Sequence, residues 1–568
     1  MDNEKLANLL FPNIDKTPDY WEQKYPVRNL PLGAEVTRYA PSPTGFVHFG
    51  ALFASLVNSL VAKYSNGVFF LRIEDTDKKR EVKSGVEAII NTLSAFDINF
   101  NEGAGQGGAY GPYIQSERVE IYQTYAKELV RQGKAYPCFC SEDELESMRA
   151  EQERNKLNYG YYGEFAKCRN LTYEQIEEKI KAGNSFVLRF KCPYTAEDRV
   201  DTFDLIRGER NIPQNENDVI ILKSDGIPPY NFAHVIDDHL MRTTEVIRGD
   251  EWLPSFAEHL QLFEALGFKP PKYAHISPIQ KLDENGNRRK LSKRKDPEAN
   301  MDYFAEKGYP VGAIKDYIMT LINSDFENWR LQNPKGNIID FHFDIKKMNV
   351  SGSLFDIVKL TDISKNYISH LTAEEVYELA IIWAEKYDAV LFESLRNNKS
   401  YWLNILNIDR EISKPRKDLS CWSEIEPTYS YMFNDDFNVE IILLELFKQK
   451  FEFSEKFAQE DKKEIWTKYL SNIATILQKY PIMYNPNDDQ QQWFEHIKDL
   501  AQEIGFAREV KEFKQNPEKY IGHCGDVSTI IRVALTGRTQ TPNLYNICQL
   551  LGKEKIQERF VNLLKKIK

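Results

Sequence analysis

The sequence predicts a doubly wound α/β domain with an α+β insertion, followed by an all-α half. Residues 36–63 have the pattern of a short strand, a loop and a helix, and strands alternate with helical segments up to residue 309. From about residue 310, apolar residues recur at i, i+3 and i+4, in segments 311–322, 372–386, 441–448, 463–479 and 491–504. Alternating strands and helices imply a parallel, Rossmann-like sheet, and 568 residues are too many for one core.

The first strand and helix meet at a junction suited to an anionic ligand. Residues 36–40 are β-prone, residues 41–45 form a loop with two prolines, and the stretch after Phe49 is apolar at helical spacing. The free N–H groups at the start of the helix therefore place His48 and Gly50 where a phosphate is stabilised. Gly50 leaves room for a flat ligand to approach the backbone. The alternative is an ordinary βα unit with a surface histidine.

Charged side chains follow two further predicted strands. Residues 67–73 end at Glu74, and the strand 244–247 is followed by Arg248, Gly249 and Glu251. Further strands are expected at 219–222 and 273–279, and ligands of such sheets lie at the carboxyl ends of the strands. Glu74 could equally cap a helix, and Arg248 could be a surface arginine in an ion pair.

The run GAGQGG at residues 103–108 matches the dinucleotide fingerprint G-x-G-x-x-G. That fingerprint needs a strand before it and a helix opening on it. Here the polar residues 99–102 precede the run and the turn-rich AYGPY follows it. We therefore interpret it as a surface loop, with the next helix at residues 116–132.

The α+β insertion is expected at residues 136–218, with a helix at 171–182 and a strand at 186–190. It contains Cys138, Cys140 and Cys168, and zinc sites of such insertions use a fourth ligand. No histidine lies near Cys168, and only tyrosines are close in the sequence. The sequence therefore favours buried, reduced cysteines over a structural zinc.

Composition indicates a soluble protein of a reducing compartment, and we expect a cytoplasmic monomer. The formal net charge is −11, so any contact with nucleic acid must use local basic patches. Seven scattered cysteines do not resemble a disulfide framework. No apolar stretch approaches the roughly 20 residues of a membrane span, and the acidic N-terminus is not a secretory signal. Residues 1–35 are expected to form an extended arm.

A basic run, RRKLSKRK, lies at residues 288–295 between a glycine and a proline, which indicates a mobile loop. Such runs are usually solvated or face nucleic acid. They can also supply positive charge to reacting phosphates. The sequence contains no Walker A motif, which disfavours kinase or ATPase chemistry of that kind.

Several motifs in the same order resemble class I aminoacyl-tRNA synthetases, and the glutamyl-tRNA synthetases in particular. The two signatures are APSPTG followed by HFG at residues 40–50 and KLSKR at residues 290–294. The resemblance continues through RIEDTD (72–77), YPCFC (136–140), LKSDGIPPYNFAHVIDDHLM (222–241), VIRGDEWLPS (246–255), LFEALGF (262–268) and RVALTGR (532–538). It thus covers most of the chain.

The resemblance implies an enzyme that joins L-glutamate to tRNA(Glu) through a glutamyl-adenylate, using ATP. Magnesium would come with the nucleotide, since no metal-ligand motif is present. The catalytic domain would occupy 36–135 and 219–309, after a 1–35 extension, with an acceptor-stem-binding insertion at 136–218. A helical connecting domain would occupy 310–440 and an anticodon-binding domain 441–568. The C-terminal end of the chain is basic, and a basic helix at such a place is more often simply solvated than bound to RNA. Contact of this helix with RNA is therefore the weaker inference.

The resemblance also assigns site residues. The catalytic residues would be His48, Lys290 and Lys293, with the lysines holding the departing pyrophosphate. Glu74 would hold the substrate ammonium. Because arginine suits a buried carboxylate better than lysine, Arg38 and Arg248 are the candidates for the two carboxylates, and which takes which stays open. The nucleotide would contact His48, Gly50, Gly249, Glu251, Lys290 and Lys293, and glutamate would contact Arg38, Ser42, Glu74, Tyr230, His234 and Arg248.

Two positions depart from the family pattern, and several alternatives stay open. Ala51 stands where many class I enzymes have a second histidine, and His234 stands where relatives commonly have asparagine. A glutaminyl-tRNA synthetase is disfavoured because that family usually has PPEPNG in place of APSPTG, and a truncated tRNA-modifying paralogue is disfavoured by the helical half. Charging of tRNA(Gln) as well as tRNA(Glu), and an inactive tRNA-binding paralogue, remain alternatives.

Overall fold

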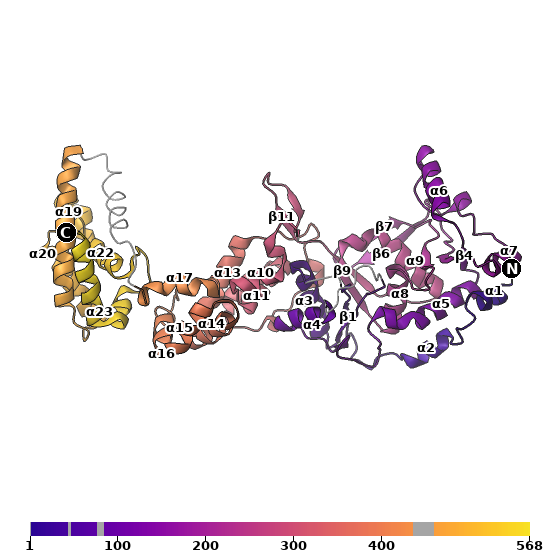
Figure 1. The fold of residues 1–568 in the computed structure, drawn as a ribbon, viewed down its shortest axis with the longest axis horizontal. Helices are drawn as coiled ribbons and strands as arrows, with labels where there is room; N and C mark the ends of the chain where they lie inside the picture. Colours follow the sequence, from indigo (N-terminus) through magenta and orange to yellow (C-terminus); the bar gives the residue numbers. More distant parts are fainter. Residues whose placement is uncertain (1, 44–46, 77–84, 293, 435–458, 568) are drawn as a thin grey trace. The chain divides into compact units, whose positions relative to one another are not determined.

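The computed structural model describes residues 2–43, 47–76, 85–292, 294–434 and 459–567 (Figure 1). The chain divides into two compact units, the first made of residues 1–304 and 315–357 and the second of residues 305–314 and 358–568. All strands in the described part lie in the first unit. None of the helices in these ranges combines the length and the apolar character needed to cross a membrane.

The first part of the sheet is parallel, as predicted. β1 (Val36–Tyr39) pairs with β2 (Val68–Leu71), which pairs with the short β3 (Glu102–Gly103). The helix α3 (Phe49–Tyr64) covers these strands with an almost entirely buried apolar side, and α4 (Gly85–Ala95) follows β2. The predicted strand at 36–40 and the helix after it are confirmed.

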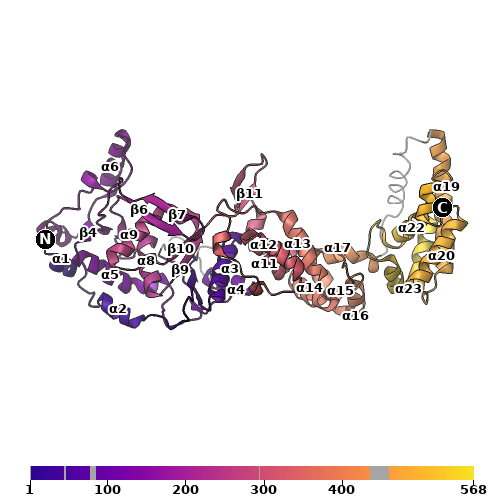
Figure 2. The same ribbon diagram turned by 180° about the vertical axis from the view of Figure 1, so that it is seen from behind.

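The second part of the sheet has four strands in the order β7-β6-β10-β9, all labelled in Figure 2. β9 (Glu245–Gly249) lies next to β1, where the Thr244 N–H donates to the Val36 carbonyl at 3.0 Å. β10 (Lys272–Ile276) is parallel to β9, β6 (Arg199–Asp204) is parallel to β10, and β7 (Gly208–Pro213) forms the antiparallel edge. The chain therefore winds outward in both directions from β1 and β9, which makes this the switch point where ligands bind.

Helices connect and cover these strands. α8 (Tyr230–Leu240) precedes β9, and the 3₁₀ segment η4 (Asp250–Ser255) and α9 (Phe256–Leu266) follow it. Gly267 ends α9 in the left-handed conformation at φ +72°, which glycine adopts readily.

The strand predicted at 219–222 is present, but its expected place in the parallel sheet was wrong. The strand at 219–222, β8 (Ile220–Leu222), does not join the parallel sheet but pairs antiparallel with β5 (Val187–Phe190), which pairs with β4 (Ala135–Cys138). Instead β6, inside the predicted insertion, adds to the parallel sheet. The buried Asp204 carboxylate explains this, because it accepts the His275 backbone N–H of β10 at 3.0 Å.

The N-terminal residues are helical, so the prediction of an extended arm was wrong. α1 (Asn3–Leu10) is capped by Asp2, and α2 (Pro18–Lys24) begins with a proline that suits a first helical turn. Both helices pack on α5 (Val119–Arg131), where the buried Trp21 indole donates to Thr124 Oγ1 at 3.1 Å. The apolar residues of this stretch therefore serve core packing.

The surface-loop interpretation of 103–108 holds in part. Gly103 ends β3, residues 105–108 are exposed, and no helix opens on the glycines, since the 3₁₀ segment η2 starts only at Gln115 (Gln115–Arg118). The run is therefore not a dinucleotide fingerprint.

The remaining elements include the helices of the insertion and of the second half. The predicted segments 311–322, 372–386, 463–479 and 491–504 are confirmed as helices, whereas 441–448 lies outside the described residues. The insertion contains α6 (Glu142–Arg154) and α7 (Tyr173–Lys181), and a hairpin of β11 (Gln280–Leu282) and β12 (Arg288–Lys290) follows β10. The later helices are α10 (Met301–Lys307), α11 (Val311–Ile322), α12 (Asp325–Gln332), α13 (Ile357–Ser369), α14 (Ala373–Tyr387), α15 (Ala389–Asn397), α16 (Lys399–Leu406), α17 (Ile425–Tyr429), α19 (Gln459–Met483), α20 (Gln490–Glu503), α21 (Val510–Gln515), α22 (Cys524–Thr536) and α23 (Leu544–Ile567).

Candidate active site

A cavity of about 760 Å³ lies in the first unit, where β1, β2, β9 and β10 end. Ten of the predicted site residues line it: Arg38, Ser42, His48, Gly50, Glu74, Tyr230, Arg248, Gly249, Glu251 and Lys290. His234 is fully buried and is not part of the lining, and Lys293 lies outside the described residues. The structure thus brings almost the whole predicted set around one cavity.

The start of α3 is built around His48. Its ring Nδ1 accepts the Ala51 N–H at 3.1 Å, so the side chain caps the helix. A Cβ on Gly50 would lie 3.2 Å from that ring, so the glycine makes room for the histidine. The sequence suggested that the room at Gly50 admits a ligand, whereas in the structure the ring takes that place. The helix N-terminus still presents its positive end to the cavity.

Gly249, at the end of β9, also makes room for a neighbouring side chain. A Cβ there would lie 2.1 Å from Glu251 Oε2, so the Glu251 side chain would have to move. The glycine therefore lets the Glu251 carboxylate fold back against the chain at the rim of the cavity.

The basic run begins as a strand, so the prediction of a loop was wrong for residues 288–290. β12 pairs with β11, and Arg289 is fixed by the Asp296 carboxylate through two hydrogen bonds of 2.6 Å. Neighbouring side chains of a strand point to opposite faces. Lys290 is accordingly exposed and lines the cavity.

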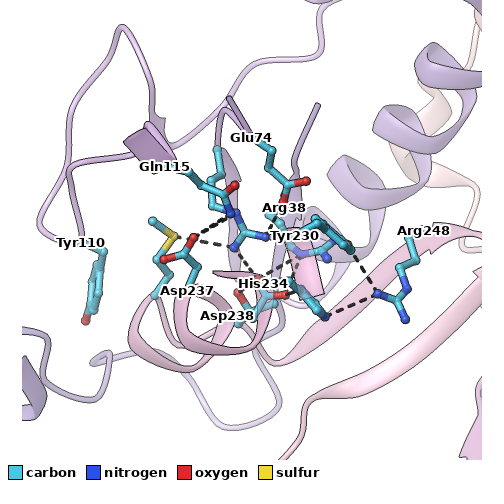
Figure 3. A network of polar contacts seen from close by, with 12 residues as sticks. Arg38, Glu74, Tyr110, Gln115, Tyr230, His234, Asp237, Asp238 and Arg248 are labelled. Carbon is cyan, nitrogen blue, oxygen red and sulfur yellow. Dashed lines mark hydrogen bonds and ion pairs between the residues drawn. The ribbon is translucent and has the colours of Figure 1, made fainter. Parts of the chain in front are cut away.

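A buried network of charges lies under the cavity floor (Figure 3). Arg38 Nε lies 3.2 Å from Asp238 Oδ1, and Arg72 Nη1 donates to the same oxygen at 2.7 Å. Arg72 also donates to Glu74 Oε1 at 2.9 Å. Burial opposes ionisation of Asp238, yet Arg38 and Arg72 hold the pKa of its carboxyl well below the ordinary value. One carboxylate therefore holds two guanidinium groups in place.

A second carboxylate anchors the back of this network. The buried Asp237 accepts from Arg118 Nε at 2.6 Å and from the amide of Gln115 and the hydroxyl of Tyr122 at 2.9 Å each. These partners come from η2 and α5, so they tie α8 to the first half of the domain.

Glu74 and Arg248 face the cavity from opposite strands. Burial raises the pKa of Glu74 to about 6, although Arg72 acts in the opposite direction. Arg248 is 6% exposed, and Tyr230, whose hydroxyl is 3.5 Å from Arg248 Nη1, stacks on the buried His234 ring. The cavity floor thus offers one carboxylate and two guanidinium groups.

Comparisons with known protein families match two separate stretches of the chain. The family described as tRNA synthetases class I (E and Q), catalytic domain, matches residues 35–362, more than half of the chain, and an anticodon binding domain matches residues 419–564. The chain belongs to the class I tRNA synthetases (E and Q). The α/β catalytic domain with helical C-terminal half, predicted from the sequence, is that of this family.

Relatives and solved structures agree with this family. A glutamate–tRNA ligase of Clostridium perfringens (strain SM101) is 46% identical over 568 residues, covering 99% of this chain and 100% of the relative. One from Acetivibrio thermocellus is also 46% identical, with the same coverage. A crystal structure of a glutamate tRNA ligase from Elizabethkingia meningosepticum in complex with its amino acid has a TM-score of 0.73 and 26% identity, covering 94% of this chain and 100% of that one.

In this class I synthetase, the three insertion cysteines converge with a tyrosine. The sulfur atoms of Cys138, Cys140 and Cys168 lie within 4.8 Å of one another, with 3.7 Å between the last two. The Tyr161 hydroxyl lies 3.4 Å from Cys138 Sγ and 3.3 Å from Cys140 Sγ. Four potential donors therefore surround one point, whereas the sequence offers no definite fourth donor.

The second unit of the synthetase contains a cavity of about 750 Å³ between α20, α22 and the start of α23. Trp493 and Phe494 give it aromatic walls, and Arg532, from the predicted RVALTGR motif, lines it. Arg532 Nε is buried without a hydrogen-bond partner among the described residues, and burial lowers its pKa. An aromatic cavity with a partly unpaired guanidinium suits a nucleobase and its phosphate.

Four buried residues around the active-site cavity escaped the sequence prediction as site residues: Arg72, Asp238, His259 and His275. Asp238 and His259 lie inside helices and His275 inside a strand, so their sequence pattern indicates core positions. The sequence did contain one signal for the missed histidines. Four of the nine histidines lie within residues 234–275, on elements beside the strand ends.

Replacing Asp238 with asparagine keeps the side-chain shape but removes the charge shared by Arg38 and Arg72. Arg38 then loses its carboxylate partner and Arg72 keeps Glu74 and the more distant Asp237, and we expect the free energy of unfolding to fall by about 3–5 kcal/mol. Urea unfolding measures this loss. The control is Glu120→Gln, because Glu120 pairs with Lys16 at the surface and its loss should cost less than about 1 kcal/mol. Equal losses in the two variants would contradict the shared-counterion role.

Proposed function

We propose that this synthetase joins L-glutamate to the 3′ end of tRNA in two steps, through a glutamyl-adenylate formed from ATP. The observation that carries the proposal is a single cavity lined by the guanidinium groups of Arg38 and Arg248 and also by the His48 helix terminus and Lys290. Two relatives at 46% identity over their full length are named glutamate–tRNA ligases, which supports the choice of amino acid.

The guanidinium groups fit the charges of glutamate. Arg38 and Arg72 pair with Asp238, Arg72 also pairs with Glu74, and Arg248 lines the cavity without an ion pair among the described residues. With Glu74 ionised, these groups leave one positive charge in excess, and free glutamate carries one negative charge. Glu74 would take the substrate ammonium. Glutamine would leave a guanidinium unpaired, which a buried site disfavours strongly.

Neutral donors would complete the amino-acid site. The hydroxyls of Tyr230 and Ser42 line the same cavity and can donate to substrate oxygens. His234 supports Tyr230 and Arg248 from behind, so we assign it a positioning role in place of a direct contact with glutamate.

Another part of the cavity lining would hold the nucleotide. The α3 N-terminus with His48, and Lys290 on β12, would surround the phosphates, with Gly50, Gly249 and Glu251 on the remaining wall. Lys293, which follows Lys290 by three residues, would act with it on the departing pyrophosphate. Magnesium would enter with ATP and neutralise phosphate charge. The attacking group is the α-carboxylate of glutamate, so no protein nucleophile is required.

The remaining domains would hold tRNA. The insertion at 136–218 would grip the acceptor stem, and the helical residues 310–440 and 441–568 would contact the stem and the anticodon. The anticodon binding domain matched at 419–564 contains the Arg532 cavity, which supports placing an anticodon base there. Phosphate contacts in these regions would make binding sensitive to salt.

The proposal is tested by charging purified tRNA(Glu) and tRNA(Gln) with labelled glutamate or glutamine in the presence of ATP. We expect charging with glutamate and none with glutamine. Charging of tRNA(Gln) with glutamate would reveal the broader, non-discriminating activity. Charging with glutamine alone, or no charging with either amino acid, would refute the proposal.

The raised pKa of Glu74 predicts that the KM for glutamate depends on pH. Below about pH 6 this carboxyl is mostly protonated and cannot balance the substrate ammonium, so the KM for glutamate should rise as the pH falls through that value. In Glu74→Gln the KM should be higher at neutral pH and should lose this inflection. Steady-state charging at pH values on both sides of 6 measures both effects. An inflection that survives in Glu74→Gln would assign it to another group.

We also propose that the cysteine cluster holds a structural zinc ion. Zinc binds thiolates at about 2.3 Å, which in a tetrahedron puts two sulfurs about 3.8 Å apart. The 3.7 Å between Cys140 and Cys168 Sγ fits that spacing, and Tyr161 adds a fourth donor. The ion would fasten β4 to residues 161–168 and so stiffen the insertion.

Metal analysis of the purified protein tests this assignment. We expect about one equivalent of zinc per chain, lost in Cys140→Ser and weakened in Tyr161→Phe. Cys192→Ser is the control, because Cys192 is a buried cysteine of the same insertion whose thiol donates to the Asn215 carbonyl at 2.9 Å. A wild-type protein that stays free of zinc after incubation with the metal would exclude the site.

A further inference from the structure

Arg248 differs from the other arginines of the active site in what holds it. No carboxylate of the described residues forms an ion pair with its guanidinium, whereas Arg38 and Arg72 both pair with Asp238. Its partners are three imidazole rings, those of His234, His259 and His275, each 0% exposed. They come from α8, α9 and β10, so three separate elements converge on one side chain.

Each ring faces a different nitrogen of the guanidinium. Arg248 Nε donates to His275 Nε2 at 3.1 Å, and Nη2 lies 3.0 Å from His259 Nδ1. Nη1 lies 3.5 Å from His234 Nε2 and also 3.5 Å from the Tyr230 hydroxyl (Figure 3). A guanidinium has five N–H donors and no acceptor, so the rings must offer lone pairs to it.

The outer nitrogens of two rings, those of His275 and His259, have partners that fix the tautomer. His275 Nδ1 lies 2.7 Å from Asp204 Oδ2, so it carries the proton and leaves Nε2 as the acceptor. His259 Nε2 lies 2.9 Å from Asn231 Oδ1, which leaves Nδ1 as the acceptor.

His234 is held differently. Its Nδ1 lies 2.6 Å from Asp238 Oδ2 without the alignment of a hydrogen bond, and its Nε2 faces Arg248 and the Tyr273 hydroxyl. All three rings are therefore neutral acceptors toward Arg248, and burial lowers the pKa of each.

We infer that these three histidines are positioning residues that aim Arg248 at a substrate carboxylate while leaving its charge uncancelled. A carboxylate anchor would fix the guanidinium equally well but would neutralise it before the substrate arrives. Three neutral anchors occupy three of the five donors, and the two remaining N–H groups lie one on each terminal nitrogen, the one on Nη1 facing the Tyr230 hydroxyl at 3.5 Å. A carboxylate that accepts from both terminal nitrogens side by side would share or displace that hydroxyl contact. The inference rests on the proposed function and adds a determinant of selectivity for glutamate over glutamine.

Substitutions at His259 can change the single atom that accepts a hydrogen bond from Arg248. The Oδ1 of asparagine can stand in the place of His259 Nδ1, so His259→Asn keeps a neutral acceptor for Arg248. His259→Asp has the same shape but carries a negative charge beside the guanidinium. His259→Leu removes the acceptor altogether.

We measure the Kd and KM for glutamate, the KM for ATP and the ratio of activity with glutamate to that with glutamine. His259→Asn should stay within about threefold of the wild type for glutamate, and His259→Asp and His259→Leu should each weaken glutamate binding about tenfold or more. The aspartate should also lower the selectivity against glutamine, because the cancelled charge no longer favours a carboxylate. The KM for ATP should stay unchanged in all three.

Substitutions at position 275 give an independent test, because the other ring nitrogen is the acceptor there. There the acceptor is Nε2, which the amide oxygen of glutamine reaches and that of asparagine does not. His275→Gln should therefore retain more glutamate affinity than His275→Asn, whereas His259→Asn should retain more than His259→Gln, because the accepting atom at 259 is Nδ1. A purely structural role would not produce this reversal.

The matched control is His239, a partly buried histidine of α8, which contacts Glu22 at 2.6 Å and not Arg248. His239→Asn and His239→Asp should leave the glutamate-to-glutamine ratio unchanged. Equal glutamate affinity in His259→Asn and His259→Asp, or a KM for ATP that changes as much as the KM for glutamate, would overturn the inference. A wild-type protein that does not activate glutamate would instead refute the proposed function.

Discussion

The buried Asp238 carboxylate is the constraint on which the amino-acid site depends. It lies inside α8, is 1% exposed, and holds Arg38 and Arg72 directly. Burying a charge is costly unless it is paired and hydrogen-bonded, so this carboxylate and its arginines must be placed together or not at all. The fold places them by bringing α8 to Arg38 on β1 and to Arg72, the residue after β2.

The distribution of charge in the cavity follows from that constraint. Asp238 pairs with two arginines and Glu74 pairs with Arg72, while Arg248 has only neutral partners among the described residues. The site is therefore short of one negative charge, at the place where the proposed substrate supplies it. The α3 terminus and Lys290 line the same cavity and add positive charge. Under the proposed function, the two groups of positive charge would bind the amino acid and the triphosphate for the same electrostatic reason.

The site residues that could be predicted from the sequence are those at the ends of strands. Parallel strands end at the same edge of a sheet, so the strand pattern by itself places Arg38, Glu74 and Arg248 together. Their supporting partners could not be placed in this way. Asp238 lies in the last turn of α8, and His275 lies in β10, inside the strand predicted at 273–279, so only tertiary packing brings them to the site.

The errors in the fold prediction have a similar cause. The strand β8 has the apolar character of a parallel strand, but pairing is decided by neighbours distant in sequence, and its neighbour is the antiparallel β5. The N-terminal helices were obscured by prolines, although Pro18 starts one of them. Local pattern predicted the element type well, and it failed where long-range pairing or a buried polar contact such as that of Asp204 decided the outcome.

A crystal structure of the enzyme with glutamate bound would show whether Arg248 receives a carboxylate of the substrate. We expect one substrate carboxylate to lie within about 3.2 Å of both terminal nitrogens of Arg248, while the three imidazoles remain on its other donors. It also predicts that the substrate ammonium lies against Glu74. Glutamate bound with both carboxylates away from Arg248, or an Arg248 released from its histidines on binding, would contradict it.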